Sequence, residues 1–90
     1  MATATITYNG QFNTIYLMNR ATQEDLPDEW LAIIKEVEGN YKNPRNFKLQ
    51  KGKTVTVDID SWIVAAGKGA DGVHGLIVHA SNKVTGDVTI

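Results

Sequence analysis

Apolar residues recur at helical spacing in one segment of the chain. Between Leu26 and Val37 they stand three and four residues apart, and the acidic residues and Lys35 take the opposite side. Pro27 suits the first turn of a helix, where its missing N–H costs nothing, and Gly39 followed by Asn40 is typical of a helix end. The pattern predicts one amphipathic helix over about 27–38. Its apolar stripe consists of Leu26, Trp30, Ile33, Ile34 and Val37.

Elsewhere the apolar residues alternate with polar ones or stand in short runs, as they do in strands. Strict alternation over 54–59 predicts a half-buried strand with Val55, Val57 and Ile59 on one face. Further strands are expected at 47–50, 73–80 and 84–90. After Asp60-Ser61, the run up to Ala66 either continues the preceding strand or forms a short helical turn.

Near the N-terminus, the sequence predicts a β-hairpin. The β-branched segment 3–8 ends at Asn9-Gly10, and Asn-Gly between two β-prone runs is typical of a two-residue hairpin turn. This register places Ala4 opposite Ile15 but leaves Asn13 on the apolar side, so a bulge or longer loop at 11–13 would improve it. Phe12 and Tyr16 then project from the opposite face. There they are either core residues of a sandwich or anchors of an interface.

Strands before and after a single helix, with short connections, indicate an α+β fold in one domain, residues 1–90. We expect the helix to pack on a mainly antiparallel sheet, or on a small barrel or sandwich, of five to six strands. The segments 2–8 and 84–90 are candidate edge strands. Neither is protected by a run of charge, so both are candidates for pairing with another chain.

Composition narrows the classes of protein to which the chain can belong. The 90 residues include no cysteine, which excludes disulfides and zinc sites built on thiolates. The net charge of −1 gives no overall attraction to nucleic acid or anionic lipid. The chain shows neither a signal peptide nor a run long enough to span a membrane. We therefore expect a cytoplasmic protein, with the virion as an alternative location.

The distribution of charge is more informative than its total. Segment 24–38 contains six acids and one base, and four of those acids lie near the helix N-terminus, where the helix dipole stabilises them. Segment 42–53 contains five bases and no acid, with Tyr41 and Phe47 interleaved. Aromatic rings among cations are used to bind single-stranded nucleic acid. The alternatives are that this segment binds an acidic protein surface or that it is a solvated edge.

Three further motifs are weaker. Residues 67–72 read GxGxxG, but a strand-like segment follows instead of the helix that a phosphate site needs, so a turn between strands is the better interpretation. Asp58 and Asp60 share a face if the strand continues, and paired carboxylates can bind a cation or act as acid and base. His74 and His79 are five residues apart, so on a strand they face opposite sides and cannot jointly bind one metal.

These observations favour a non-enzymatic protein-interaction or assembly module that acts through strand faces, edges and a basic loop. We expect a protein partner, with self-association, and no catalytic residue, metal, cofactor or membrane contact. By size and fold alone the chain resembles phage and viral accessory or structural proteins. The alternatives are a single-stranded nucleic-acid binder using 41–53, and a small enzyme or metal-binding domain around Asp58, Asp60 and a His. The predicted partner-binding residues are Tyr41, Lys42, Arg45, Phe47, Lys48, Lys51, Lys53, Phe12 and Tyr16.

Overall fold

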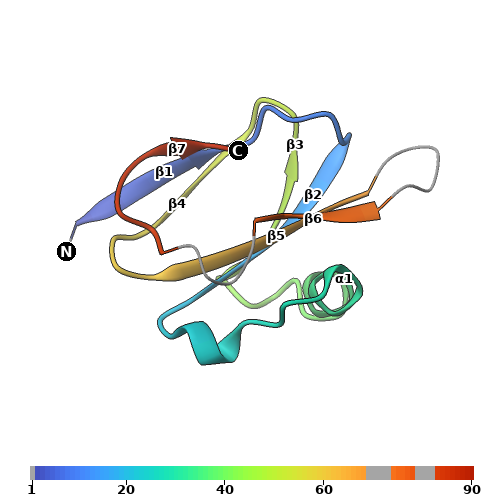
Figure 1. The fold of residues 1–90 in the computed structure, drawn as a ribbon, viewed down its shortest axis with the longest axis horizontal. Helices are drawn as coiled ribbons and strands as arrows, with labels where there is room; N and C mark the ends of the chain where they lie inside the picture. The colour runs from blue at the N-terminus through green and yellow to red at the C-terminus, as the bar shows by residue number, and fades with distance from the viewer. Residues whose placement is uncertain (1, 69–73, 79–82) are drawn as a thin grey trace.

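The computed structural model describes residues 2–68, 74–78 and 83–90. Within these residues, one α-helix and two sheets form three layers (Figure 1). The elements in chain order are β1 (Thr3–Thr7), β2 (Thr14–Arg20), the short 3-10 helix η1 (Gln23–Asp25), α1 (Trp30–Gly39), β3 (Asn46–Gln50), β4 (Thr54–Asp58), β5 (Trp62–Lys68), β6 (His74–Val78) and β7 (Val88–Thr89).

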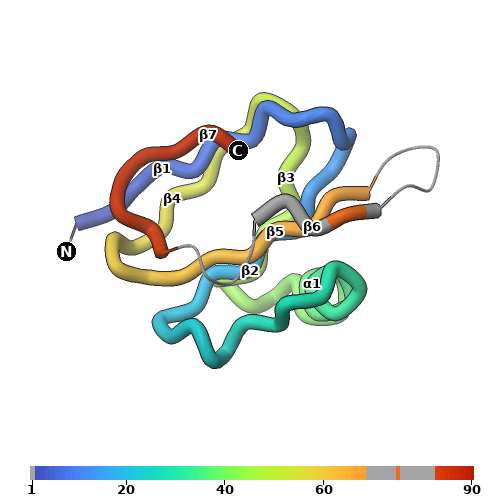
Figure 2. The backbone as a smooth tube through the Cα atoms, in the orientation of Figure 1, coloured from blue at the N-terminus to red at the C-terminus, as the bar shows by residue number. Residues whose placement is uncertain are grey.

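The strands divide between a three-stranded sheet, ordered β4-β1-β7, and a four-stranded sheet, ordered β3-β2-β5-β6. All neighbours are antiparallel except β1 and β7, the first and last strands of the chain, which run parallel and side by side (Figure 2). The four-stranded sheet is the middle layer, with α1 on its outer face (Figure 1).

The main core lies between the two sheets. Alternate residues of β1 and β4 face it, because successive side chains of a strand point to opposite faces. They meet the inward residues of the four-stranded sheet, so both inner faces are shielded from water. The buried members of this cluster are Ala4, Ile6, Tyr8, Ile15, Leu17, Leu49, Val57, Ile63, Ala65 and Val84.

A second core joins α1 to the other face of the four-stranded sheet. The helix contributes Ile33, Ile34 and Val37, the last three residues of its predicted stripe. The sheet contributes residues that alternate with those of the first core: Tyr16, Met18, Val64 and Ala66. Burial of this stripe explains why a ten-residue helix, which would be marginal alone, is stable here.

The α+β class, with one helix on two small sheets, is therefore confirmed. The described residues form seven strands, one more than the upper expectation, because Trp62–Lys68 forms a separate strand, β5. The helix begins at Trp30 and not at Pro27. Leu26 is nevertheless buried in the helix cluster, through the chain that follows η1.

The predicted hairpin is wrong, because β1 and β2 belong to different sheets. A type I′ turn needs positive φ at both central residues, and neither Asn9 nor Gly10 has it. Instead, the Tyr8 ring packs against Gly10 and its hydroxyl donates to the Phe12 carbonyl at 2.8 Å. The Asn9 N–H donates to the Ile90 carbonyl, so this segment carries the chain from one sheet to the other.

The strands predicted around 47–50 and 54–59 are confirmed as β3 and β4. The helical turn considered for the run up to Ala66 is wrong, because these residues form β5. Asp60, at φ 70°, makes the turn from β4 into β5. Segment 2–8 is not an edge strand, since β1 lies between β4 and β7, whereas β7 is an edge as expected. None of the helices in the described ranges is long and apolar enough to cross a membrane.

Candidate protein-binding surface

The loop between α1 and β3 is held by side-chain amides. Asn46, buried at the start of β3, donates from Nδ2 to the Glu36 carboxylate at 2.8 Å and to the Asn40 carbonyl at 3.0 Å. Asn40 donates to the same carboxylate at 3.1 Å. Together with Arg20, whose Nη2 lies 3.7 Å from the Glu36 Oε2, these amides hold the pKa of Glu36 below its usual value. The loop therefore has a fixed position on the sheet.

Tyr41 stands on this loop with 74% of its surface exposed. It lines a groove of about 450 Å³ together with Val37 and Glu38 of α1 and Asn46 and Lys48 of β3. The groove combines an exposed aromatic ring, one carboxylate and one ammonium group. A tyrosine offers both apolar contact and a hydroxyl, which is why this residue type is frequent in protein interfaces.

Tyr16 and Lys48 meet beside this groove. The Lys48 Nζ lies 5.6 Å from the centre of the Tyr16 ring, within the range of a cation–π contact. Burial, with a hydrogen bond to Glu38 and its negative charge, raises the pKa of the Tyr16 hydroxyl. Tyr16 is only 4% exposed beneath α1, so its ring supports the groove and is not itself a contact surface.

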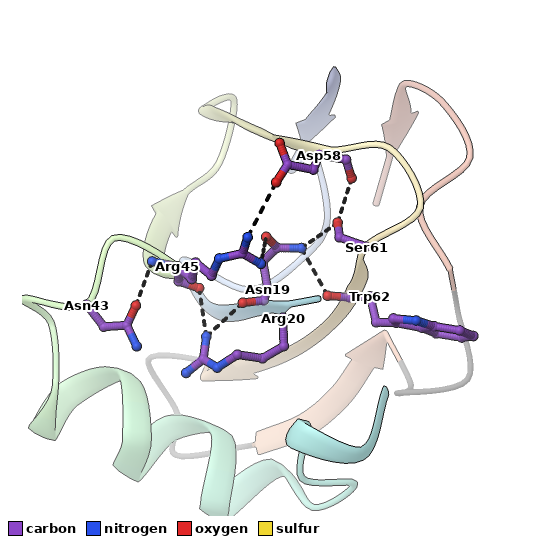
Figure 3. A network of polar contacts seen from close by, with 7 residues as sticks. All are labelled: Asn19, Arg20, Asn43, Arg45, Asp58, Ser61 and Trp62. Atoms are coloured by element: carbon purple, nitrogen blue, oxygen red, sulfur yellow. Dashed lines mark hydrogen bonds and ion pairs between the residues drawn. The ribbon is translucent and has the colours of Figure 1, made fainter. Parts of the chain in front are cut away.

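Arg45 is part of an internal polar network (Figure 3). Its guanidinium lies 3.4 Å from both the Asn19 Oδ1 and the Asp58 Oδ2. Asn19 is buried and donates to the Ser61 hydroxyl and the Trp62 carbonyl, at 2.8 and 3.0 Å. This network links the start of β3 to the ends of β2 and β4. The Arg45 charge is accordingly partly balanced within the protein.

Apart from Lys42, which directly follows Tyr41, the remaining predicted partner-binding bases and Phe47 do not gather around Tyr41. Lys51 and Lys53 are exposed in the turn after β3, while Lys42 is exposed before it. The strand between them has five residues and separates its ends by roughly 13 Å. Phe47 packs partly against the core between the sheets. The basic segment is therefore divided between the two ends of β3, and Tyr41 is the exposed ring of the predicted aromatic pair.

Phe12 and Tyr16 do not share a face, contrary to the hairpin register. Phe12 lies against the cluster between the sheets, and Tyr16 belongs to the cluster under α1. The Phe12 ring covers Gly67, where an added Cβ would stand only 2.3 Å from the ring. Gly67 pairs with Gly75 across β5 and β6, so this aromatic ring fills the space that two adjacent glycines leave.

The remaining motifs do not form a site in the described residues. Asp58 ends β4 and Asp60 lies in the following turn, so the prediction that they share a strand face is wrong. Asp58 contacts Arg45, whereas the Asp60 Oδ1 lies 3.6 Å from the Lys83 Nζ. No group of three potential metal ligands occurs in these ranges. Gly67 and Lys68 belong to β5, whereas residues 69–72 of the GxGxxG segment and His79 lie outside the described residues.

Sequence reasoning found Tyr41 and Lys48 but not the other residues of the groove. The sequence pattern places Val37 in the core and Glu38 on a solvated face, and it gives no signal for Asn46. The role of Asn46 depends on the tertiary contact between β3 and the helix loop, where its side chain is buried. The sequence signal for a site at this position is Tyr41 itself. It directly follows the Gly39-Asn40 helix end, so this large aromatic residue is not part of the buried helix stripe.

No protein-family model, curated protein or solved structure matches the chain.

Proposed function

We propose that the protein is a small non-enzymatic interaction module that binds a partner protein through the groove at Tyr41. The observation that carries this proposal is the 74% exposure of the Tyr41 ring beside that groove. An exposed aromatic ring next to a concave surface is the typical arrangement of an interface hot spot. The amides that hold the loop support the proposal further, because a pre-positioned side chain loses less entropy on binding.

The chemistry of the groove favours a partner segment with both apolar and charged groups. Val37 and the Tyr41 ring provide apolar contact, while Glu38 and Lys48 provide opposite charges. Single-stranded nucleic acid is the second candidate. It has less support, because Phe47 packs against the core and only Tyr41 of the predicted pair presents its ring.

The test replaces Tyr41 with a photo-crosslinking aromatic amino acid in the full chain. We expect light-dependent coupling to a defined protein, and none from the same group placed at Gln23, which is also exposed but lies in η1. The purified partner then binds Tyr41→Ala at least about tenfold more weakly, as hot-spot residues require. Leu31→Ala, at an exposed apolar residue of α1, is the matched control and leaves the affinity unchanged.

Equal coupling from both positions, or equal affinity of the Tyr41→Ala and Leu31→Ala proteins, would contradict the proposal. Salt-dependent binding of a single-stranded oligonucleotide that Tyr41→Ala abolishes would favour the second candidate instead.

A further inference from the structure

The outer edge of β4 carries unused backbone hydrogen-bonding groups. β4 ends the three-stranded sheet, and no described residue pairs with its outer side. The Ile59 N–H donates to the Ala2 carbonyl, and the Lys53 carbonyl accepts from the Tyr8 N–H, so these odd-numbered positions face β1. Backbone groups alternate along an antiparallel strand. Those of Thr54, Thr56 and Asp58 therefore point outward, although the Asp58 carbonyl already accepts hydrogen bonds from the Ser61 N–H and hydroxyl.

Two of the other three edges, β3 and β7, are less available for pairing. On β3, the Asn46 N–H donates to the Asn43 carbonyl and the Gln50 carbonyl accepts from the Lys53 N–H. Lys48 stands between them, and a lysine in an edge strand opposes pairing with another chain. β7 has only two residues. β4 has five, with neither a proline nor a lysine within the strand.

The core between the sheets is incompletely covered along this side. Val55 of β4 and Phe47 of β3 pack against the core but remain partly exposed, whereas Val57 is buried. Another strand placed along β4 would continue the inner face and cover Val55. It would thereby remove apolar surface from water as well as satisfy the backbone groups.

The charges that flank β4 favour antiparallel pairing with β4 of a second copy of the chain. Lys51 and Lys53 precede the strand, Asp58 ends it and Asp60 lies in the turn that follows. Each carboxylate also lies near a base of its own chain, Arg45 and Lys83 respectively. Antiparallel pairing with the same strand brings the basic end of each copy next to the acidic end of the other. Parallel pairing would place like charges together.

Antiparallel pairing centred on Thr56 also matches the side chains. Thr56 then faces Thr56 of the second copy, and Val55 faces Val57 on the inner side. Thr54 faces Asp58 on the outer side. The outward backbone groups of Thr56 oppose each other in this register, as a hydrogen-bonded pair requires.

We propose that β4 pairs antiparallel with β4 of a second copy about a twofold axis at Thr56, joining two three-stranded sheets into one. The inference goes beyond the proposed function, because it concerns a second copy of this chain and a different surface from Tyr41, so the two can fail separately. An interface in which the same strand serves both copies is the usual form of a twofold dimer.

The test uses two opposite charges at the axis. Thr56 is exposed, so Thr56→Lys and Thr56→Glu are compatible with the folded monomer. Each places two like charges opposite each other, and each should raise the dimer dissociation constant at least about tenfold in sedimentation equilibrium. An equimolar mixture of the two variants brings an ammonium opposite a carboxylate and should restore the dimer. Thr89→Lys, on the opposite edge of the same sheet, is the control that keeps wild-type association.

A wild-type chain that stays monomeric up to about millimolar concentration would overturn the inference. So would variants that dimerise as the wild type does, or a mixture that stays monomeric. Loss of the dimer in Tyr41→Ala, with both Thr56 variants still dimeric, would place self-association at the groove. That outcome would support the proposed function and reject pairing through β4. Circular dichroism and thermal melting confirm that each variant is folded.

Discussion

At the scale of single residues, two glycines lie against aromatic rings that the sequence does not predict beside them. Asn9-Gly10 is typical of a hairpin, and 67–72 is typical of a flexible turn. In the structure, the Tyr8 ring lies against Gly10 and the Phe12 ring lies against Gly67. Both glycines therefore admit an aromatic ring close to the backbone, which a side chain would obstruct.

Gly67→Ala should consequently destabilise the fold. The added Cβ would stand 2.3 Å from a carbon of the Phe12 ring, so the ring must move out of a packed position. We expect a loss of about 2 kcal/mol in the free energy of unfolding, measured with urea. Phe12→Ala should cost a similar amount on its own, because the ring packs against the core.

The double variant separates this contact from a general effect of the backbone. If the ring and the Cβ collide, Gly67→Ala should cost about 1 kcal/mol less when Phe12 is already alanine. Gly39→Ala is the matched control, since nothing lies within 4 Å of its added Cβ. Additive losses for Gly67 and Phe12 would show that the collision is not the cause.

At the scale of elements, the helix is attached to the sheet by polar contacts as well as by its apolar stripe. Glu36 lies on the inner side of the last turn. Its carboxylate receives hydrogen bonds from Asn46 and Asn40 and lies near Arg20. One carboxylate thus connects α1 with the start of β3 and the end of β2.

The pH dependence of stability should reflect this arrangement. Hydrogen bonds from Asn46 and Asn40 and the charge of Arg20 lower the pKa of Glu36 in the folded state. Its stabilising contribution is therefore complete above the pKa of the unfolded chain and is lost as the pH falls through the folded pKa. We expect Glu36→Gln to be less stable than the wild type at about pH 7, and the difference to shrink toward about pH 3.

Chemical unfolding at both pH values measures this difference. Glu24→Gln removes one negative charge from the exposed η1 and controls for the change in net charge. A Glu36→Gln protein that loses as much stability in acid as the wild type would contradict the role given to this carboxylate.

The elements were predictable where one face meets water and the other does not. The stripe Ile33, Ile34 and Val37 and the alternation around Val57 follow directly from such half-burial. β5 was ambiguous because its residues are buried on both sides, between the two cores, and such a run has no period. The partner of β1 was not predictable, because it depends on where the chain crosses between sheets and not on local turn chemistry.

The candidate site was predictable only in part for a related reason. Tyr41 and Lys48 stand out in sequence as an aromatic and a base in a charged segment. Their separation from Lys51 and Lys53 follows from the length of β3, and the contribution of Asn46 follows from its contact with the helix loop. The open edge of β4 likewise depends on strand order, which the sequence did not provide.

At the scale of the whole molecule, pairing joins segments that are far apart in the chain. β2 pairs with β5, and β1 pairs with both β4 and β7. The carboxylate of Asp87 accepts a hydrogen bond from the Thr5 N–H at 2.7 Å, across 82 positions of sequence. Closing such long loops costs conformational entropy before the stabilising contacts between the strands can form.

Folding should therefore be slow for a chain of 90 residues, in the range of milliseconds to seconds. Stopped-flow fluorescence of Trp30 and Trp62, which both pack against the helix cluster, can measure the folding rate.

Because β7 joins β1 from the far end of the chain, we expect β7 to dock after the main folding barrier. Asp87→Ala should then accelerate unfolding and leave the folding rate nearly unchanged. Asp87→Asn keeps a hydrogen-bond acceptor for the Thr5 N–H, so it should accelerate unfolding less. A folding rate that falls as much as unfolding rises would place this contact in the transition state instead.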